Sequence, residues 1–227
     1  MTVTVAAART RSVPLAVRAV AVLLPVGPLA IAVLRLVLPY YTAPDSADVV
    51  RAANAHPGRE SAVIWLGYVG VLLLVPGVMV VARLCRDAAP RLTTWALALA
   101  VPGYVSMGVM LGYDHLVWSA THAQLSVSDA AAVLDAAHPS LEVSMGVFVV
   151  GHVVGTVLLG LALLRSGRIP PWVAWAVTIS QPIHFIATVV LGSPQVDFVG
   201  WSLTALGLAF VARVVLGDGA VGRRTGA

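Results

Sequence analysis

The chain has 227 residues, of which 59% are hydrophobic and only 11% are charged, and its mean hydropathy is +0.92. A soluble domain of this length cannot bury that much apolar surface, so the composition indicates a membrane protein. The formal net charge of +4 comes from scattered arginines without a basic stripe or interleaved aromatic residues, which argues against nucleic acid as a partner and favours the lipid bilayer.

Six apolar segments follow one another, each close to the roughly 20 residues that an α-helix needs to cross a bilayer. They cover residues 17–38, 62–83, 94–114, 143–164, 171–191 and 196–216. The sequence therefore predicts an all-α, polytopic membrane protein, with a six-helix transmembrane bundle that forms one integral membrane domain over residues 1–227. Prolines inside these segments, at Pro25, Pro28, Pro76, Pro102 and Pro182, predict breaks or kinks.

The arginines predict the orientation, because basic residues near span ends are retained on the cytoplasmic side. The chain contains no lysine, and only Arg35, Arg51 and Arg59 fall at or near the outer side. The others fall on one side: Arg9, Arg11, Arg18, Arg83, Arg86, Arg91, Arg165, Arg168, Arg213, Arg223 and Arg224. We therefore expect a protein of the cytoplasmic (inner) membrane with both termini in the cytoplasm.

Two outer segments, residues 39–61 and 115–142, are long enough to contain short helices. Asp45 or Ser46 is a suitable cap for a helix over 47–55, and Ser126 or Ser128 for one over 129–137. Each segment ends in His-Pro-x-x-Glu, and the two copies lie 82 residues apart, which indicates a duplicated unit of span, outer helix and span.

The repeated motif has two interpretations. Its residues His56, Glu60, His138 and Glu142 are of the types that bind a divalent transition metal. Alternatively, histidine ends one helix, proline prevents its continuation, and glutamate stabilises the N-terminus of the next span. The second interpretation needs no metal, and the sequence implies no metal or other cofactor.

The strongest candidates for chemistry are His152 and His184, because ionisable residues inside a bilayer are costly and usually face the bundle interior. Both fall about 12 to 14 Å from the outer ends of consecutive spans, given a rise of 1.5 Å per residue. Polar residues recur around them at helical spacing, which predicts two facing polar stripes: Ser144, His152 and Thr156, and Gln181, His184 and Thr188. The alternatives are simple packing of neutral imidazoles and axial ligation of a haem.

Three further residues near the outer ends of spans are candidates for acid and base chemistry. Asp114 and His115 place a carboxylate beside an imidazole, although neighbours on a helix point about 100° apart. Glu142 begins the fourth span and could connect a buried site to water. Asp197 is expected only to stabilise the N-terminus of the sixth span.

Several chemistries lack their motifs: the chain has no Gly-x-Ser-x-Gly elbow, no phosphate-binding loop and no His-Glu-x-x-His helix, and Cys85 is its only cysteine. The stretch Leu164–Trp175, which reads LRSGRIPPWVAW, together with the long outer segment after the first span, resembles uncharacterised six-span membrane proteins common in actinobacteria. That resemblance implies a fold and a membrane, and it transfers no active residue.

Three functions fit these observations. The first is an intramembrane enzyme, an isomerase, cyclase or hydrolase, acting on a lipophilic small molecule. His152 and His184 would exchange protons, Gln181 would orient the substrate, and Asp114, His115 or Glu142 would connect the site to water. The second is a small proton-coupled carrier or exporter, which the apparent lack of a carboxylate in mid-membrane disfavours. The third is a non-catalytic scaffold or sensor.

Overall fold

The computed structural model describes the backbone of residues 15–224 and the side chains of residues 15–217, and it contains no strand within that part of the chain. Six of its helices are long and apolar enough to cross a membrane. The chain is therefore a multi-pass, all-α membrane protein, as predicted. Arg9 and Arg11 lie outside the described residues, as do the side chains of Arg223 and Arg224.

The first span consists of α1 (Leu15–Leu23) and α2 (Val26–Val37), which are separated at Pro25 as expected. The remaining spans are α4 (Pro57–Cys85), α5 (Pro90–His122), α7 (Ser140–Ser166), α8 (Pro171–Ile186) with its π-helical continuation η1 (Ala187–Leu191), and α9 (Pro194–Arg224). Helices α4 and α5 run through Pro76 and Pro102 without ending. The π-helical turn begins five residues after Pro182, and such turns are frequent at functional sites.

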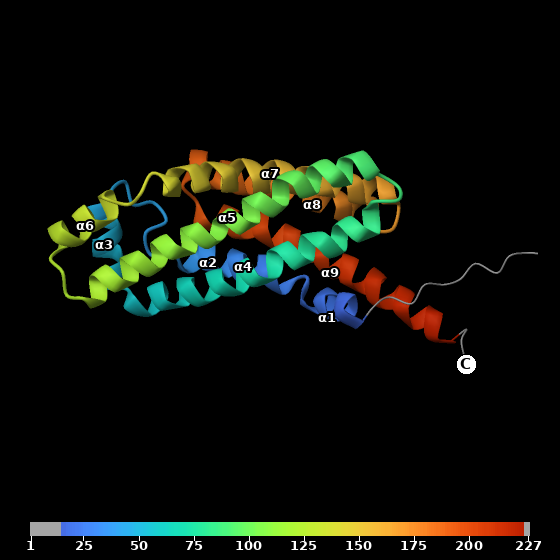
Figure 1. Ribbon diagram of the computed structural model, residues 1–227, viewed down its shortest axis with the longest axis horizontal. Helices are drawn as coiled ribbons and strands as arrows, with labels where there is room; N and C mark the ends of the chain where they lie inside the picture. The colour runs from blue at the N-terminus through green and yellow to red at the C-terminus, as the bar shows by residue number, and fades with distance from the viewer. Residues whose placement is uncertain (1–14, 225–227) are drawn as a thin grey trace, which may run out of the picture.

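The two short outer helices are α3 (Ser46–Ala55) and α6 (Val127–Asp135). Their N-terminal caps form as the sequence predicts: Asp45 accepts a hydrogen bond from the Asp48 backbone amide at 2.8 Å, and Ser126 accepts one from Asp129 at 3.1 Å. In Figure 1 both helices lie together at one end of the bundle, beyond the ends of α2 and α7.

Helix α5 extends further than the sequence predicts. The third apolar segment was expected to end at residue 114, but α5 continues to His122. The extension is stabilised by burial, because Val117 and Ala120 pack against Val50 of α3 and Leu134 of α6. Asp114 consequently lies inside a helix rather than at its end.

The duplicated units predicted from the sequence correspond to two antiparallel helix pairs, since α2 packs against α4 and α5 packs against α7. Helices α5 and α7 approach closely through small residues: a Cβ at Gly151 would lie 2.8 Å from the Gly103 Cα, and one at Gly155 would lie 2.5 Å from the Ala100 amide nitrogen. A Cβ added at Gly112 of α5 would meet nothing within 4 Å, so the Gly-x-x-x-Gly pair of Gly108 and Gly112 makes no such close approach at Gly112.

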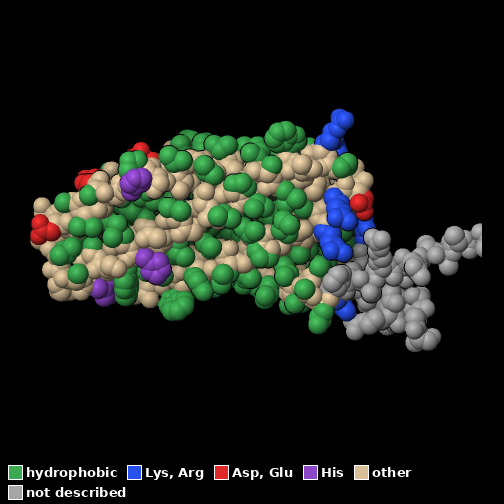
Figure 2. All heavy atoms as spheres, in the orientation of Figure 1, with side chains coloured by type: hydrophobic (Ala, Val, Ile, Leu, Met, Phe, Trp, Pro, Cys, Tyr) green, Lys and Arg blue, Asp and Glu red, His purple; other side chains and the backbone are tan. Residues whose placement is uncertain are grey.

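Charge is distributed unevenly along the molecule. Figure 2 shows arginine side chains gathered at the end opposite α3 and α6, with an acidic side chain among them, while the other visible acidic side chains and the histidines lie toward the α3–α6 end. Between these two ends the visible surface is largely hydrophobic and without charge, as expected for a lipid-facing belt.

Candidate functional site

A cavity of about 400 Å³ lies in the half of the bundle nearer α3 and α6. Its walls come from both helix pairs and from α8 and α9, and most of them are apolar or aromatic. The apolar lining consists of Ile31, Leu34, Leu38, Gly67, Met107, Met110, Leu111, Leu141, Met145, Phe148 and Trp201. The polar lining consists of Arg35, Tyr40, Tyr113, Asp114 and His184. An apolar chamber with a few polar groups is typical of a small-molecule site.

His184 is held by a carboxylate at the wall of this cavity. Its Nδ1 lies 2.6 Å from Asp197 Oδ1, and the Asp197 side chain is fully buried. The other oxygen, Asp197 Oδ2, lies 2.5 Å from Arg35 Nε and 2.8 Å from the Tyr41 hydroxyl. Both groups donate to Asp197, and the guanidinium supplies a compensating charge, so the carboxyl group is held in its ionised form.

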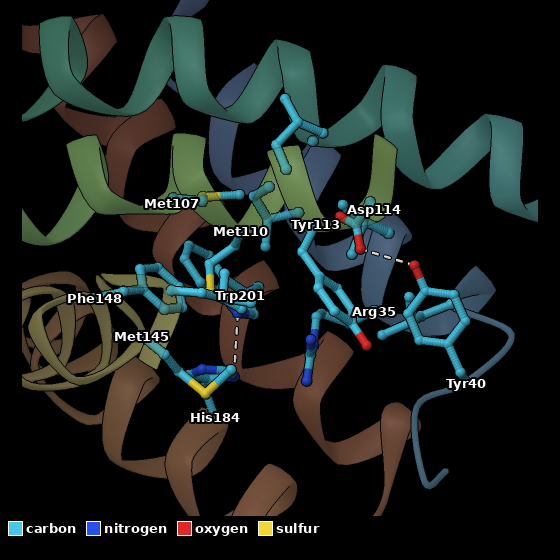
Figure 3. A pocket seen from close by; sticks show the side chains of 16 residues that line it. Arg35, Tyr40, Met107, Met110, Tyr113, Asp114, Met145, Phe148, His184 and Trp201 are labelled. Carbon is cyan, nitrogen blue, oxygen red and sulfur yellow. Dashed lines mark hydrogen bonds between the residues drawn. The ribbon is translucent and has the colours of Figure 1, made fainter. Parts of the chain in front are cut away.

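The ionised Asp197 fixes the tautomer of His184. Because a carboxylate only accepts hydrogen bonds, His184 must carry its proton on Nδ1 and donate it to Asp197. The indole Nε1 of Trp201, 3.2 Å from the same ring nitrogen, then finds no lone pair there (Figure 3). Nε2 of His184 has no hydrogen-bond partner among the described residues, so its lone pair is available to a ligand.

His152 packs behind His184. The two ring centroids are 5.2 Å apart, which confirms the expectation that the two histidines lie at similar depth and face one another. The His152 ring is stacked on Phe148 at 4.1 Å, and its Nδ1 donates to the Phe148 carbonyl at 2.5 Å. Its Nε2 is buried without a partner, and the residue itself does not line the cavity. The ring spacing leaves no room for a porphyrin between the imidazoles.

A second polar cluster lies at another part of the same cavity. The Tyr40 hydroxyl lies 2.8 Å from Asp114 Oδ1 and 3.1 Å from Glu60 Oε1. Figure 3 shows Tyr40 and Asp114 on the side of the cavity away from His184 and Trp201, with Tyr113 and Arg35 between them. Burial, followed by the charge of Asp114, raises the pKa of Tyr40 far above its ordinary value, so this phenol stays protonated.

The remaining candidates from the sequence lie elsewhere. Gln181 is buried and donates from Nε2 to Thr204 Oγ1 of α9 at 3.0 Å, so it does not reach the cavity. His115 and Glu142 are exposed and do not line the cavity either. The predicted polar stripes of α7 and α8 contact each other through the rings of His152 and His184. Thr156 of the α7 stripe is instead hydrogen-bonded to Tyr104 of α5, at 2.8 Å.

The two His-Pro-x-x-Glu motifs have different environments. Glu60 is buried beneath Tyr40, while His56, His138 and Glu142 are exposed. His56 is the C-terminal cap residue of α3, as the second interpretation expects, whereas α6 already ends at Asp135 and His138 Nδ1 accepts a hydrogen bond from the Ser140 amide at the start of α7, at 3.2 Å. Within the described part of the chain, no three His, Cys, Asp or Glu side chains are grouped to hold a metal ion.

Sequence reasoning missed three residues that build the site. Asp197 was expected only to stabilise a helix terminus, and Arg35 and Tyr40 were not considered for the site. The three come together because the end of α2 lies against α9 and the following turn lies against α4 and α5. The available signal was an arginine inside an apolar segment, which requires a buried acidic partner.

Comparisons of this chain with protein-family models, with curated proteins and with solved structures find no match.

Proposed function

We propose that this protein is an intramembrane acid/base enzyme acting on a lipophilic small molecule. The observation that carries the proposal is the Asp197–His184 pair at the cavity wall, in which Asp197 orients the imidazole and leaves Nε2 as an available base. A carboxylate that holds histidine in one tautomer and stabilises the imidazolium is the arrangement that general-base catalysis requires.

The cavity contains one group that can accept a proton from a bound molecule and another that can return one to it. His184 Nε2 takes a proton from the bound molecule, and Asp197 with Arg35 stabilises the resulting charge. On the other side of the cavity, Glu60, Tyr40 and Asp114 are hydrogen-bonded in series, and Asp114 serves as the second proton-exchanging group by passing a proton from this series to the bound molecule. These groups fit direct proton relocation, as in an isomerase or cyclase.

His152 acts through His184 in this proposal. Its ring is held between Phe148 and the parallel ring of Trp201. Its unpartnered Nε2 provides a second proton acceptor in the interior, 5.2 Å away by ring centroid. We therefore assign it a positioning and proton-exchanging role.

The orientation follows from the uneven charge. With the arginine-rich end in the cytoplasm, both termini are cytoplasmic, α3 and α6 lie outside, and the cavity lies in the outer half of the bilayer. We also propose that the protein lies in the cytoplasmic (inner) membrane. We further propose that it is related to the six-span actinobacterial proteins that its LRSGRIPPWVAW stretch resembles.

A proton-coupled carrier is the second candidate. The sequence predicted no carboxylate in mid-membrane for it, but Glu60, Asp114 and Asp197 all lie inside the folded bundle. A carrier and an enzyme share the cavity and the same acid/base groups, and they differ in whether the bound molecule leaves chemically changed.

The test is isotopic exchange. Purified protein in lipid nanodiscs is incubated in D₂O with a lipid extract, and the extract is then analysed by mass spectrometry. We expect one or more lipophilic compounds to gain deuterium with the wild type and to lose that gain with His184→Asn. The matched control His115→Asn replaces an exposed histidine and keeps the exchange. Equal exchange by wild type and His184→Asn would refute the general-base role.

A further inference from the structure

The charge of the buried carboxyl groups is balanced on only one side of the cavity. Asp197 has Arg35 as its counterion. Glu60 and Asp114 have no hydrogen bond or ion pair with a basic side chain in the described part of the chain, and their shared partner is the neutral Tyr40 hydroxyl. Two ionised carboxylates there would therefore leave uncompensated negative charge inside the bundle, which is costly.

The hydrogen bonds of Tyr40 indicate which of the two carboxyl groups is protonated. The Tyr40 hydroxyl contacts both carboxyl groups but has one hydrogen, so it can donate to only one of them. The shorter contact, 2.8 Å, assigns that hydrogen to Asp114. Glu60 must then donate its own proton to the Tyr40 oxygen. Its Oε2, buried and without a partner, is consistent with a neutral carboxylic acid.

The result is a chain of hydrogen bonds from Glu60 through Tyr40 to Asp114, with one stored proton and one negative charge. Only Asp114 and Tyr40 face the cavity; Glu60 lies behind them, in the first turn of α4. The negative end of this series of hydrogen bonds therefore faces the cavity, and the proton is stored on the side away from it.

The cavity is suited to an organic cation with an apolar body. Asp114 supplies the negative charge on one side, and Phe148 and Trp201 supply aromatic faces on the other, with Tyr113 between them (Figure 3). Three methionines, Met107, Met110 and Met145, add polarisable apolar surface. Of the other titratable groups, Arg35 and His184 line the cavity: Arg35 is paired with Asp197, which does not line it, and His184 is neutral when it donates to Asp197. On α3, Asp48 is paired with Arg51 at the surface.

We propose that the cavity binds a lipophilic cation, a protonated amine or a quaternary ammonium with an apolar body, and that binding displaces the stored proton. The cation lies against Asp114, and Glu60 releases its proton to the outer water, so one positive charge enters the cavity as one leaves. This deepens the proposed function by naming its ligand class, and it rests on that function only in taking the cavity as the binding site.

The experiment is calorimetric titration of the wild-type protein in lipid nanodiscs with 4-phenylbutyltrimethylammonium. Titrations in two buffers with different enthalpies of ionisation give the number of protons released for each cation bound. We expect saturable binding with release of about one proton. The neutral molecule 4-phenylbutanol should bind at least about tenfold more weakly, because it has no charge to pair with Asp114.

Two variants test the two ends of the hydrogen-bond chain. Asp114→Asn should lose at least about tenfold in affinity for the cation, whereas Asp48→Asn, at the surface of α3, should not. Glu60→Gln should still bind the cation but release no proton, and this readout stands even where Asp114→Asn fails to fold.

Three outcomes would overturn the inference: equal binding of the neutral molecule, no proton release by the wild type, or unchanged proton release in Glu60→Gln. Different results would contradict the ligand class and the enzymatic function. Deuterium exchange without cation binding removes the ligand class alone, and cation binding without any exchange removes the enzyme and leaves the carrier.

Discussion

The ion pair between Arg35 and Asp197 should hold α2 against α9, and removing one partner should destabilise the protein strongly. Asp197 is fully buried and Arg35 is 19% exposed by side chain, so solvent screens the pair little. Asp197→Asn deprives the arginine of its counterion and weakens the contacts to Tyr41 and His184 as well.

Breaking one partner of a buried pair costs about 3–5 kcal/mol, and we expect the lower end, about 3 kcal/mol, because Arg35 keeps some access to water. For a chain of this length, 1 kcal/mol corresponds to a shift in melting temperature of about 2–4 °C, so the expected loss is about 6–12 °C. Tryptophan fluorescence during heating of the detergent-purified protein measures it, with Asp48→Asn as the control for loss of a surface charge.

A double-mutant cycle tests the physical reason. Arg35→Gln alone should also destabilise, because it leaves the Asp197 carboxylate buried without a counterion, and the double variant should be more stable than the sum of the two losses predicts. We expect a coupling free energy of about 2 kcal/mol. Additive losses, or a melting temperature of Asp197→Asn equal to that of Asp48→Asn, would show that the ion pair does not hold these helices together.

Three further predictions concern packing, titration and capping. Gly151→Ala should lower stability by about 1–3 kcal/mol, because its Cβ would lie 2.6 Å from the Leu99 carbonyl oxygen, while Gly112→Ala, which meets nothing within 4 Å, should be neutral or stabilising in the same thermal assay. The raised pKa of Tyr40 means that folding keeps its proton bound, so its contribution to stability is complete below pH of about 10 and is lost at higher pH. Melting temperatures between pH 8 and 11 should therefore fall less steeply for Tyr40→Phe than for the wild type, and an identical slope would contradict this. Asp45→Ala removes the cap of α3 and should cost about 0.5–2 kcal/mol, which amide hydrogen exchange of α3 would detect as faster exchange.

The sequence was sufficient for the architecture because the membrane limits the possible folds. A chain in hydrocarbon must satisfy its backbone hydrogen bonds locally, so each apolar segment of about 20 residues becomes a helix. The structure confirms all six candidate spans and both outer helices. The extent of α5 was not predicted, because hydropathy does not show that Val117 and Ala120 are buried against α3 and α6 in the part of the helix that follows Asp114.

The sequence also indicated part of the site. His152 and His184 could be paired by depth, since the turn between consecutive antiparallel helices fixes their relative height, and the ring spacing of 5.2 Å confirms that pairing. Which neighbours orient these rings was decided by helix rotation and packing. Gln181 faces Thr204 on α9 instead of the cavity, and His115 faces outward, one helical step from Asp114.

The sequence by itself determined that this protein crosses a membrane six times, because hydrophobic length is a local property that each segment carries independently. Only the tertiary structure decided which charged residues share the interior. Arg35 and Asp197 are separated by 162 positions, and Tyr40 and Asp114 by 74, yet each pair forms one hydrogen bond. The physical reason is that a buried charge must find a partner of opposite charge or a proton, and that partner is fixed by which helices pack together and not by position along the chain.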